Sequence, residues 1–299
     1  PVYLATNIIK NYVTYFSPKF LFFNGGTQYQ FSLPNHGLVY PACLPFFYVG
    51  LIYLIYLSFK SDSEENKNNF RMLLAWILIS PIPASLTNES YAVIRATTML
   101  PTVEIISAIG LYFVLDKIPK KYSVLVTILS VIFPVAIYLS AENYLYDYLM
   151  NYRINYSWSW QYGYKDVSNY INNNYNNYDK IIITKKYGEP HEFLLYYLKY
   201  DPNKYLSDKN KISFFQSNWW WVDRFDKFWF VNDWQVKLNS PELSSIQEKF
   251  ITESKHDIDC SNSKCLLVTS PDNFPPGWKK VLTINFLDGK KAFELYTNN

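Results

Sequence analysis

The feature that most constrains this chain is an uninterrupted apolar segment near its start. Residues 38–59 carry no charged side chain. A helix needs roughly 20 mainly apolar residues to cross about 30 Å of hydrocarbon, so this segment predicts a membrane-spanning helix. The same reasoning predicts three further spans at 72–87, 96–115 and 124–141. The second of them is short and holds Pro81 and Pro83, so we expect a kinked or partly unwound span.

Basic residues in the connecting loops orient these spans. The loop after the first span and the loop after the third each hold three basic residues, Lys60, Lys67 and Arg71 in one and Lys117, Lys120 and Lys121 in the other. The loop 88–95 holds only Arg95. The positive-inside rule therefore places the two basic loops in the cytoplasm, and residues 1–37, loop 88–95 and everything after 141 outside.

Residues 1–37 are predicted to form an extracytoplasmic segment beside the membrane. Within it, residues 3–16 place Leu4, Ile8, Tyr12, Tyr15 and Phe16 on one face, which is typical of an amphipathic helix. We expect this helix to lie in the outer interface. A helix packed on the soluble domain would show the same periodicity, and that alternative stays open.

Residues 142–299 have a different pattern from the membrane segments. Helices are predicted at 164–175 and 189–199, and strands at 180–184, 228–231 and 265–269. A final hairpin pairs 281–287 with 291–296 around Asp288-Gly289. The predicted fold is a membrane α-helical bundle of about four transmembrane helices, followed by a small extracytoplasmic α/β domain.

Composition and motifs exclude several function classes. The net charge is +3, with 28 basic and 25 acidic residues and no basic stripe, so we expect no nucleic-acid partner. There is no P-loop, Rossmann glycine fingerprint, HExxH or GxSxG motif, and Gly25-Gly26 is interpreted as a simple loop break. Cys260 and Cys265 could form a disulfide or stay free, Cys43 fits a core position, and no metal site is predicted.

The outer loop and its surroundings supply the candidate functional residues. Arg95 could hold a phosphate bidentately at the membrane surface, or could be an ordinary interfacial arginine. Glu89 could orient Arg95 or bind a sugar hydroxyl, or could simply be solvated. Glu104 inside the third span and His36 before the first each have a structural alternative. Trp219, Trp220 and Trp221 could stack on sugars, dip into the interface or fill a core.

Several segments resemble a known class of membrane enzymes. They are YFSPKFLFFNGG (15–26), GLVYPACLPFFYVGL (37–51), SPIPASLTNESYAVIRATTMLP (80–101), YDKIIITKKYGEPHEFLLYYLKYDP (178–202), FDKFWFVNDW (225–234) and LDGKKAFEL (287–295). The chain resembles the C-terminal portion of polytopic GT-C glycosyltransferases related to protein O-mannosyltransferases and aminoarabinose transferases. The resemblance implies an integral protein of the plasma (inner) membrane.

The resemblance also implies an activity and its partners. Such enzymes move a sugar, here a mannose-like hexose, from a polyprenyl-phosphate donor to an acceptor hydroxyl on a protein, lipid or glycan. It implies that Arg95 binds the lipid phosphate and that Glu89 and Tyr91 line the substrate cavity, although many relatives carry a His near position 91. His36 is a further candidate for this cavity from its place in the sequence before the first span. No cofactor is expected, and a divalent cation is left open.

The expected mechanism is inverting transfer at the outer membrane face. A carboxylate would deprotonate the acceptor, and Arg95 would stabilise charge on the leaving phosphate. The resemblance places this catalytic base in a loop upstream of Pro1, so we expect this portion alone to be inactive and to belong to a longer protein. Two other hypotheses remain: a non-enzymatic membrane-anchored protein whose outer domain binds a ligand or partner, and a transporter, for which no internal repeat is found.

Overall fold

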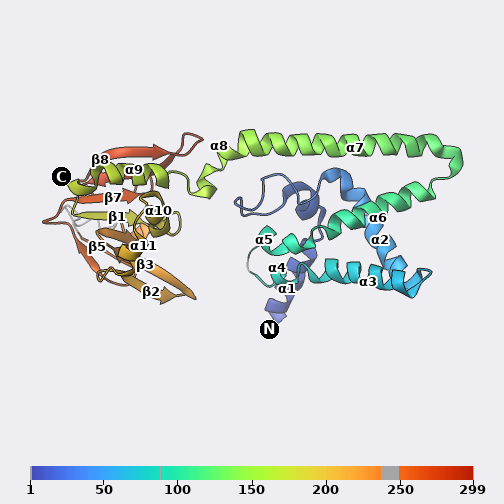
Figure 1. The fold of residues 1–299 in the computed structure, drawn as a ribbon, viewed down its shortest axis with the longest axis horizontal. Coiled ribbons are helices and arrows are strands. Elements are labelled where there is room, and N and C mark those ends of the chain that lie inside the picture. The colour runs from blue at the N-terminus through green and yellow to red at the C-terminus, as the bar shows by residue number, and fades with distance from the viewer. Residues whose placement is uncertain (1, 88, 90, 237–248, 299) are drawn as a thin grey trace. The chain divides into compact units, whose positions relative to one another are not determined.

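The chain folds as two compact units, Pro1–Arg153 and Ile154–Asn299 (Figure 1). The structure is a computed structural model and describes residues 2–87, 89, 91–236 and 249–298. In the described residues, the first unit is helical and the second combines helices with a mixed sheet.

The first unit consists of helices and short helical turns, with a non-helical segment at 25–40. In chain order they are α1 (Val2–Thr14), a π-helical turn (Lys19–Asn24), a 3-10 turn (Pro41–Cys43), α2 (Leu44–Lys60), α3 (Glu64–Ile79), α4 (Ile82–Ser85), α5 (Val93–Ala96), a 3-10 turn (Thr97–Met99), α6 (Thr102–Lys117), a 3-10 turn (Lys120–Tyr122), α7 (Ser123–Tyr146), a π-helical turn (Asp147–Tyr152) and α8 (Arg153–Asn155), which crosses the boundary between the units.

Two continuous helices are long and apolar enough to cross a membrane. They are Pro41–Lys60, which overlaps the predicted first span 38–59 except for its first three residues, and Lys120–Asn155, which contains the predicted last span 124–141. The predicted span 96–115 falls on a pair of segments, Val93–Met99 and Thr102–Lys117, that would cross only as one broken span with a bend of 45°. Pro101 lies between the two segments, where a proline interrupts helical hydrogen bonding.

The predicted span 72–87 is divided between two helices. α3 ends at Ile79 and α4 begins at Ile82, so the break falls at Pro81, as the two prolines predict. The first two turns of α3 are polar, beginning with Glu64 and Glu65. Among the described residues this segment does not qualify as a span by length and composition.

α2 and α6 approach so closely that only glycine fits between them. A Cβ atom on Gly110 would lie 1.9 Å from the carbonyl oxygen of Phe46 and 2.7 Å from the amide nitrogen of Gly50. A Cβ atom on Gly50 would lie 2.0 Å from the carbonyl oxygen of Ile106. From Gly50 beside Gly110, the next contact joins the rings of Tyr53 and Phe113, with centroids 4.2 Å apart, so α2 and α6 run in the same general direction. Small residues permit this backbone contact between membrane helices.

The N-terminal helix α1 packs within the first unit. The Tyr12 hydroxyl donates to the carbonyl oxygen of Leu78 at 2.7 Å, and the Asn11 amide to that of Thr87 at 3.4 Å. The helix predicted at 3–16 is therefore present. Its polar contacts join it to the α3–α4 segment, whereas the open alternative placed it on the soluble domain.

The second unit is built on a seven-stranded mixed sheet in the order β2-β3-β4-β1-β7-β9-β8, with a separate β5-β6 pair. β1 runs parallel to β4 and β7, and the other pairs are antiparallel. The elements are a 3-10 turn (Ser157–Trp160), α9 (Tyr164–Asn174), a 3-10 turn (Tyr175–Asn177), β1 (Lys180–Thr184), α10 (Pro190–Tyr197), α11 (Pro202–Leu206), β2 (Ile212–Gln216), β3 (Trp219–Phe225), β4 (Phe228–Val231), a 3-10 turn (Asp233–Gln235), β5 (Lys249–Ile251), β6 (Asp257–Asp259), β7 (Cys265–Thr269), β8 (Lys279–Asn285) and β9 (Lys291–Thr297).

Both faces of the central strands are buried. Along β1, Ile181 and Ile183 join a cluster with Val167 and Leu194 from α9 and α10. Ile182, which points the other way, packs in a second cluster with Trp278. Because successive side chains in a strand alternate between faces, a continuous apolar run such as this one needs cover on both sides.

The predicted strands 180–184, 228–231 and 265–269 are confirmed as β1, β4 and β7, and the closing hairpin as β8 and β9. The predicted helices correspond to α9 and α10. Cys260 and Cys265 form a disulfide, and Cys43 is buried as a free cysteine. The strands β2 and β3 were not predicted. Trp219 and Trp220 on β3 are 56% and 64% exposed, so these two do not fill a core.

We expect Gly110→Ala to destabilise the helical unit strongly. Even one methyl group would overlap the carbonyl oxygen of Phe46, and overpacking of this kind costs about 1–3 kcal/mol or more. Thermal unfolding of the purified protein in detergent should show a lower transition temperature. Tyr112→Leu is the matched control, since Tyr112 lies on the same helix and is exposed. Equal transition temperatures for Gly110→Ala and the control would contradict the backbone contact.

Glu294 on β9 is a carboxylate of the second unit whose side chain is fully buried. Its Oε1 atom lies 2.5 Å from Lys280 Nζ and 3.1 Å from Lys291 Nζ. Its Oε2 atom accepts from the Tyr296 hydroxyl and from the amide of Asp272. Burial raises the pKa of Glu294, but the hydrogen bonds from Lys280, Asp272 and Tyr296 outweigh it and hold the pKa at about 2.

This depressed pKa predicts a pH-dependent stability. The folded domain favours ionised Glu294, so the contribution is complete above the ordinary value of 4.5 and is lost as the pH falls toward about 2. Glu294→Gln should lower the unfolding free energy by about 2 kcal/mol at pH 7, and the difference should shrink below pH 4. Tryptophan fluorescence can follow this, because every tryptophan except Trp76 lies in the second unit. Asp257→Asn, an exposed carboxylate on β6, is the control; a constant difference from pH 7 to pH 2 would refute the prediction.

Candidate functional site

Arg95 lies on the short helix α5 and is paired with Glu89. Arg95 Nη1 is 2.6 Å from Glu89 Oε2, and the Gln28 amide donates to the other oxygen, Oε1, at 2.7 Å. The side chains of Arg95 and Glu89 are 44% and 41% exposed. The carboxylate is thus held from two sides, and it orients a guanidinium that stays open to solvent on the first unit.

Tyr91 is held between the outer loop and the N-terminal segment. Its ring stacks on Phe20 with centroids 5.7 Å apart and planes 14° apart, and Lys19 Nζ lies 5.9 Å from its ring centroid. The backbone at Tyr91 has φ of 57°, in the left-handed region. The next residue, Ala92, donates its amide to the Tyr15 hydroxyl at 3.1 Å. These contacts fix Tyr91 and Ala92 directly before α5 begins.

Gly26 makes this course possible. A Cβ atom at Gly26 would lie 2.4 Å from Val93 Cγ2 and 2.8 Å from the carbonyl oxygen of Tyr91. The sequence interpretation of Gly25-Gly26 as a simple loop break was therefore incomplete, because Gly26 is the point of closest packing against the loop that carries Glu89 and Arg95. Two consecutive glycines were the only signal in the sequence.

His36 is paired with a carboxylate far away in the sequence. Its Nε2 atom lies 2.8 Å from Asp147 Oδ2, and Asn151 donates to Asp147 Oδ1 at 2.6 Å. The imidazole meets the ring of Tyr144 edge-on, with centroids 5.3 Å apart. Since a carboxylate only accepts, Nε2 carries the proton in this pair, and Nδ1 of a neutral ring is left as the acceptor.

A cavity of about 510 Å³ lies beside the His36–Asp147 pair. Its volume is in the range of small-molecule sites. The polar side chains on its wall are those of Ser32, His36, Tyr40, Thr97, Glu104 and Tyr144, and the remaining lining is mainly apolar. Glu104, which the sequence places inside the third span, therefore faces a cavity that it shares with His36.

The structure brings only some of the predicted site residues together. Glu89 and Arg95 are in contact, and Tyr91 lies in the same loop. His36 lies on the wall of the cavity, whose described lining includes Val93 and Thr97 on either side of Arg95, and not Arg95 itself. Asn88 and Ser90 of the predicted outer loop lie outside the described residues.

Two site residues could not be found from sequence. Gln28 is 61 positions from Glu89, and Asp147 is 111 positions from His36. Neither belongs to a motif, so only the fold reveals the pairs. Among the described residues, no group of three or more His, Cys, Asp or Glu side chains is placed to hold a metal ion.

The second unit holds a separate polar cluster at the carboxyl ends of its parallel strands. After β1, Lys185 Nζ lies 2.7 Å from Asp223 Oδ1 and 3.3 Å from Glu253 Oε2, with Lys185 and Asp223 buried. After β4 and β7, the carboxylate of Asp233 accepts from the Ser270 hydroxyl at 2.8 Å. Ligands often bind at this edge of α/β sheets, although here the described side chains bond to one another.

Comparison of the chain with protein-family models, with curated proteins and with solved structures gave no match.

We expect His36 and Asp147 to stabilise the first unit as a coupled pair. His36→Ala and Asp147→Ala should each lower the unfolding free energy. The double variant should lower it by less than the sum of the two single losses. The coupling should be about 1 kcal/mol, because removal of either partner leaves the other without its hydrogen bond. Unfolding in detergent measures all four proteins of the cycle. Strictly additive losses would show that the pair is not formed.

Proposed function

We propose that this chain is the C-terminal portion of an integral-membrane glycosyltransferase that uses a polyprenyl-phosphate sugar donor. It would transfer a mannose-like sugar to an acceptor hydroxyl on a protein, lipid or glycan. The observation that supports this most is the Glu89–Arg95 pair, oriented by Gln28 beside the broken apolar helix pair α5–α6. An oriented arginine beside apolar helices suits a phosphate that is attached to a lipid tail.

In this proposal Arg95 binds the lipid phosphate and stabilises the negative charge that grows on it as the sugar leaves. Hydrogen-bond donors aimed at such charge lower a barrier by a few kcal/mol. Glu89 positions the guanidinium. The cavity beside His36 would hold the sugar or the acceptor, since its wall offers hydroxyl, imidazole and carboxylate groups. The base remains assigned to an upstream carboxylate, on the resemblance alone.

The membrane topology in this proposal has four spans with residues 142–299 outside the cytoplasm of the plasma (inner) membrane. Support comes from the two qualifying helices, from the bent α5–α6 pair and from the basic loops. The second span in chain order, 72–87, would be the C-terminal half of α3 together with α4. A divalent cation stays open in this proposal, and no other cofactor is included.

A second candidate function is a non-enzymatic membrane protein whose outer domain binds a ligand or partner. The β2–β3 hairpin favours it, because Phe215, Trp219 and Trp220 are 58%, 56% and 64% exposed. Such aromatic side chains are common at binding surfaces. In this case substitution of Trp219 and Trp220 would abolish binding, while substitution of Arg95 would have no effect.

The transferase proposal predicts that Arg95→Ala in the full-length protein lowers turnover at least tenfold. Arg95→Lys should recover only part of it, because an ammonium cannot bind a phosphate bidentately. Sugar transfer from a polyprenyl-phosphate donor in membranes is the measurement. Lys10→Ala is the control, a basic and exposed residue of the same unit. Near wild-type transfer by a correctly folded Arg95→Ala variant would refute the role of Arg95.

A further inference from the structure

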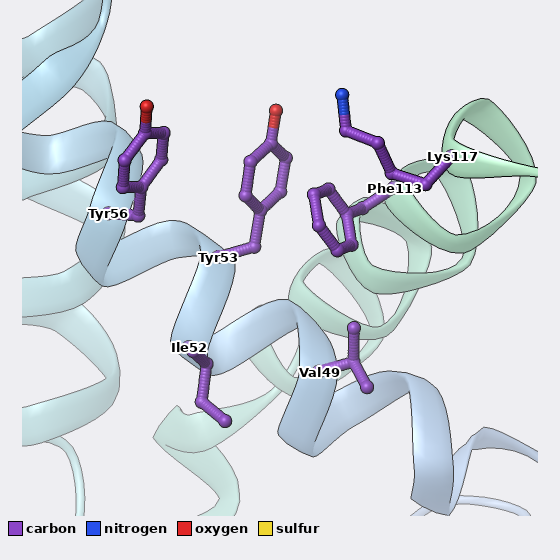
Figure 2. A pocket seen from close by; sticks show the side chains of 6 residues that line it. All are labelled: Val49, Ile52, Tyr53, Tyr56, Phe113 and Lys117. Carbon is purple, nitrogen blue, oxygen red and sulfur yellow. The ribbon is translucent and has the colours of Figure 1, made fainter.

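A groove lies between α2 and α6 toward their C-terminal ends. Six side chains line its volume of about 560 Å³: Val49, Ile52, Tyr53, Tyr56, Phe113 and Lys117 (Figure 2). Among the described residues, it shares no lining residue with the cavity beside His36. None of the residues considered so far as a functional site belongs to it.

The close packing of the two helices positions this groove. α2 and α6 touch at Gly50 and Gly110, and about one turn further along, the rings of Tyr53 and Phe113 meet with centroids 4.2 Å apart. Because the helices run parallel, their C-terminal residues, Lys60 and Lys117, belong to the same end of the pair. The groove therefore opens beside the basic end of two membrane helices.

The groove has an apolar side and a polar side. Figure 2 shows the hydroxyl groups of Tyr53 and Tyr56 and the ammonium group of Lys117 directed to one side, with Ile52 directed to the other. The two tyrosine rings are nearly parallel, with planes 13° apart and centroids 6.1 Å apart. Two hydroxyl donors and one cation are therefore aligned above an apolar surface.

Lys117 is not neutralised by a buried partner. Its Nζ atom lies 3.4 Å from Asp116 Oδ2, but the two side chains are 65% and 51% exposed. It also lies 5.8 Å from the ring centroid of Phe113. An exposed ion pair of this kind contributes little, so an anion of higher charge density can compete for the ammonium group.

We propose that this groove binds an anionic phospholipid. The headgroup phosphate accepts hydrogen bonds from Lys117, Tyr53 and Tyr56, and an acyl chain lies along Val49 and Ile52. Lysine and tyrosine at the ends of membrane helices lie at the level of the headgroups, and basic pockets between helices bind acidic headgroups. Charge favours this occupant over a further helix, since Lys117 is joined by Lys60, Lys120 and Lys121 at the same end.

The experiment uses the full chain in nanodiscs made from equal parts of phosphatidylglycerol and phosphatidylcholine. After the protein is released from the nanodiscs, native mass spectrometry should show one phosphatidylglycerol molecule retained on the wild type in preference to phosphatidylcholine. Lys117→Gln should reduce this retention at least fivefold, which corresponds to the loss of one cation near an anionic headgroup. Lys117→Arg should retain most of it.

Lys121→Gln is the matched control. It removes the same charge four residues away, and its ammonium group lies over the ring of Tyr122 and does not line the groove. We expect less than a twofold change for this variant. The double variant Tyr53→Phe with Tyr56→Phe should weaken retention at least twofold, because it removes both hydroxyl groups and keeps the rings.

Three outcomes would overturn the proposal. One is equal retention of phosphatidylglycerol and phosphatidylcholine by the wild type. This comparison does not depend on the folding of any variant. Another is an equal effect of Lys117→Gln and Lys121→Gln, which would indicate general surface attraction. The third is disulfide crosslinking of two Ile52→Cys chains without retained lipid, which would show that a second copy covers the groove.

Discussion

The backbone contact between Gly50 and Gly110 is the constraint on which the rest of the helical unit depends. In the proposed membrane setting, lipid tails are as apolar as the side chains of the helices, so close packing would supply the attraction that water supplies in soluble proteins. The contact fixes the alignment of α2 and α6. Phe47 then packs in the same buried cluster as Val103 and Ile106.

The same alignment connects the two ends of the unit. At one end it brings Tyr53 against Phe113 and opens the groove that ends in Lys117. At the other end α6 begins directly after Pro101, and the short segments before this proline carry Arg95. The lining of the cavity beside His36 includes Glu104 on α6 and Cys43, which directly precedes α2. A change in helix spacing would therefore alter the cavity and the groove together.

Local sequence patterns predicted most of the fold. Contacts between residues that are far apart in the sequence could not be predicted in this way. β1, β4 and β7 were predictable because short apolar runs bounded by polar residues describe buried strands. The spacing of Cys260 and Cys265 was compatible with a disulfide, but the sequence left free cysteines as an equal alternative. The hairpin β2–β3 was missed because its tip is Ser217-Asn218, both with positive φ, and this pair is not among the common hairpin-turn signals such as Asn-Gly or Asp-Gly. In the site, Arg95 and Glu89 are close in sequence, whereas Gln28 and Asp147 reach their partners only through the fold.

The Glu89–Arg95 pair raises the question of whether a salt bridge would block the phosphate that Arg95 is proposed to bind. Both side chains are more than two-fifths exposed, and exposed pairs contribute only about 0–1 kcal/mol. The contact uses Nη1, and a guanidinium has further N–H donors in a planar fork. Glu89 cannot easily follow a moving guanidinium, because Gln28 holds its other oxygen. The carboxylate therefore restrains the orientation of Arg95 at little cost to its capacity for a phosphate, and such preorganisation is what transition-state stabilisation requires.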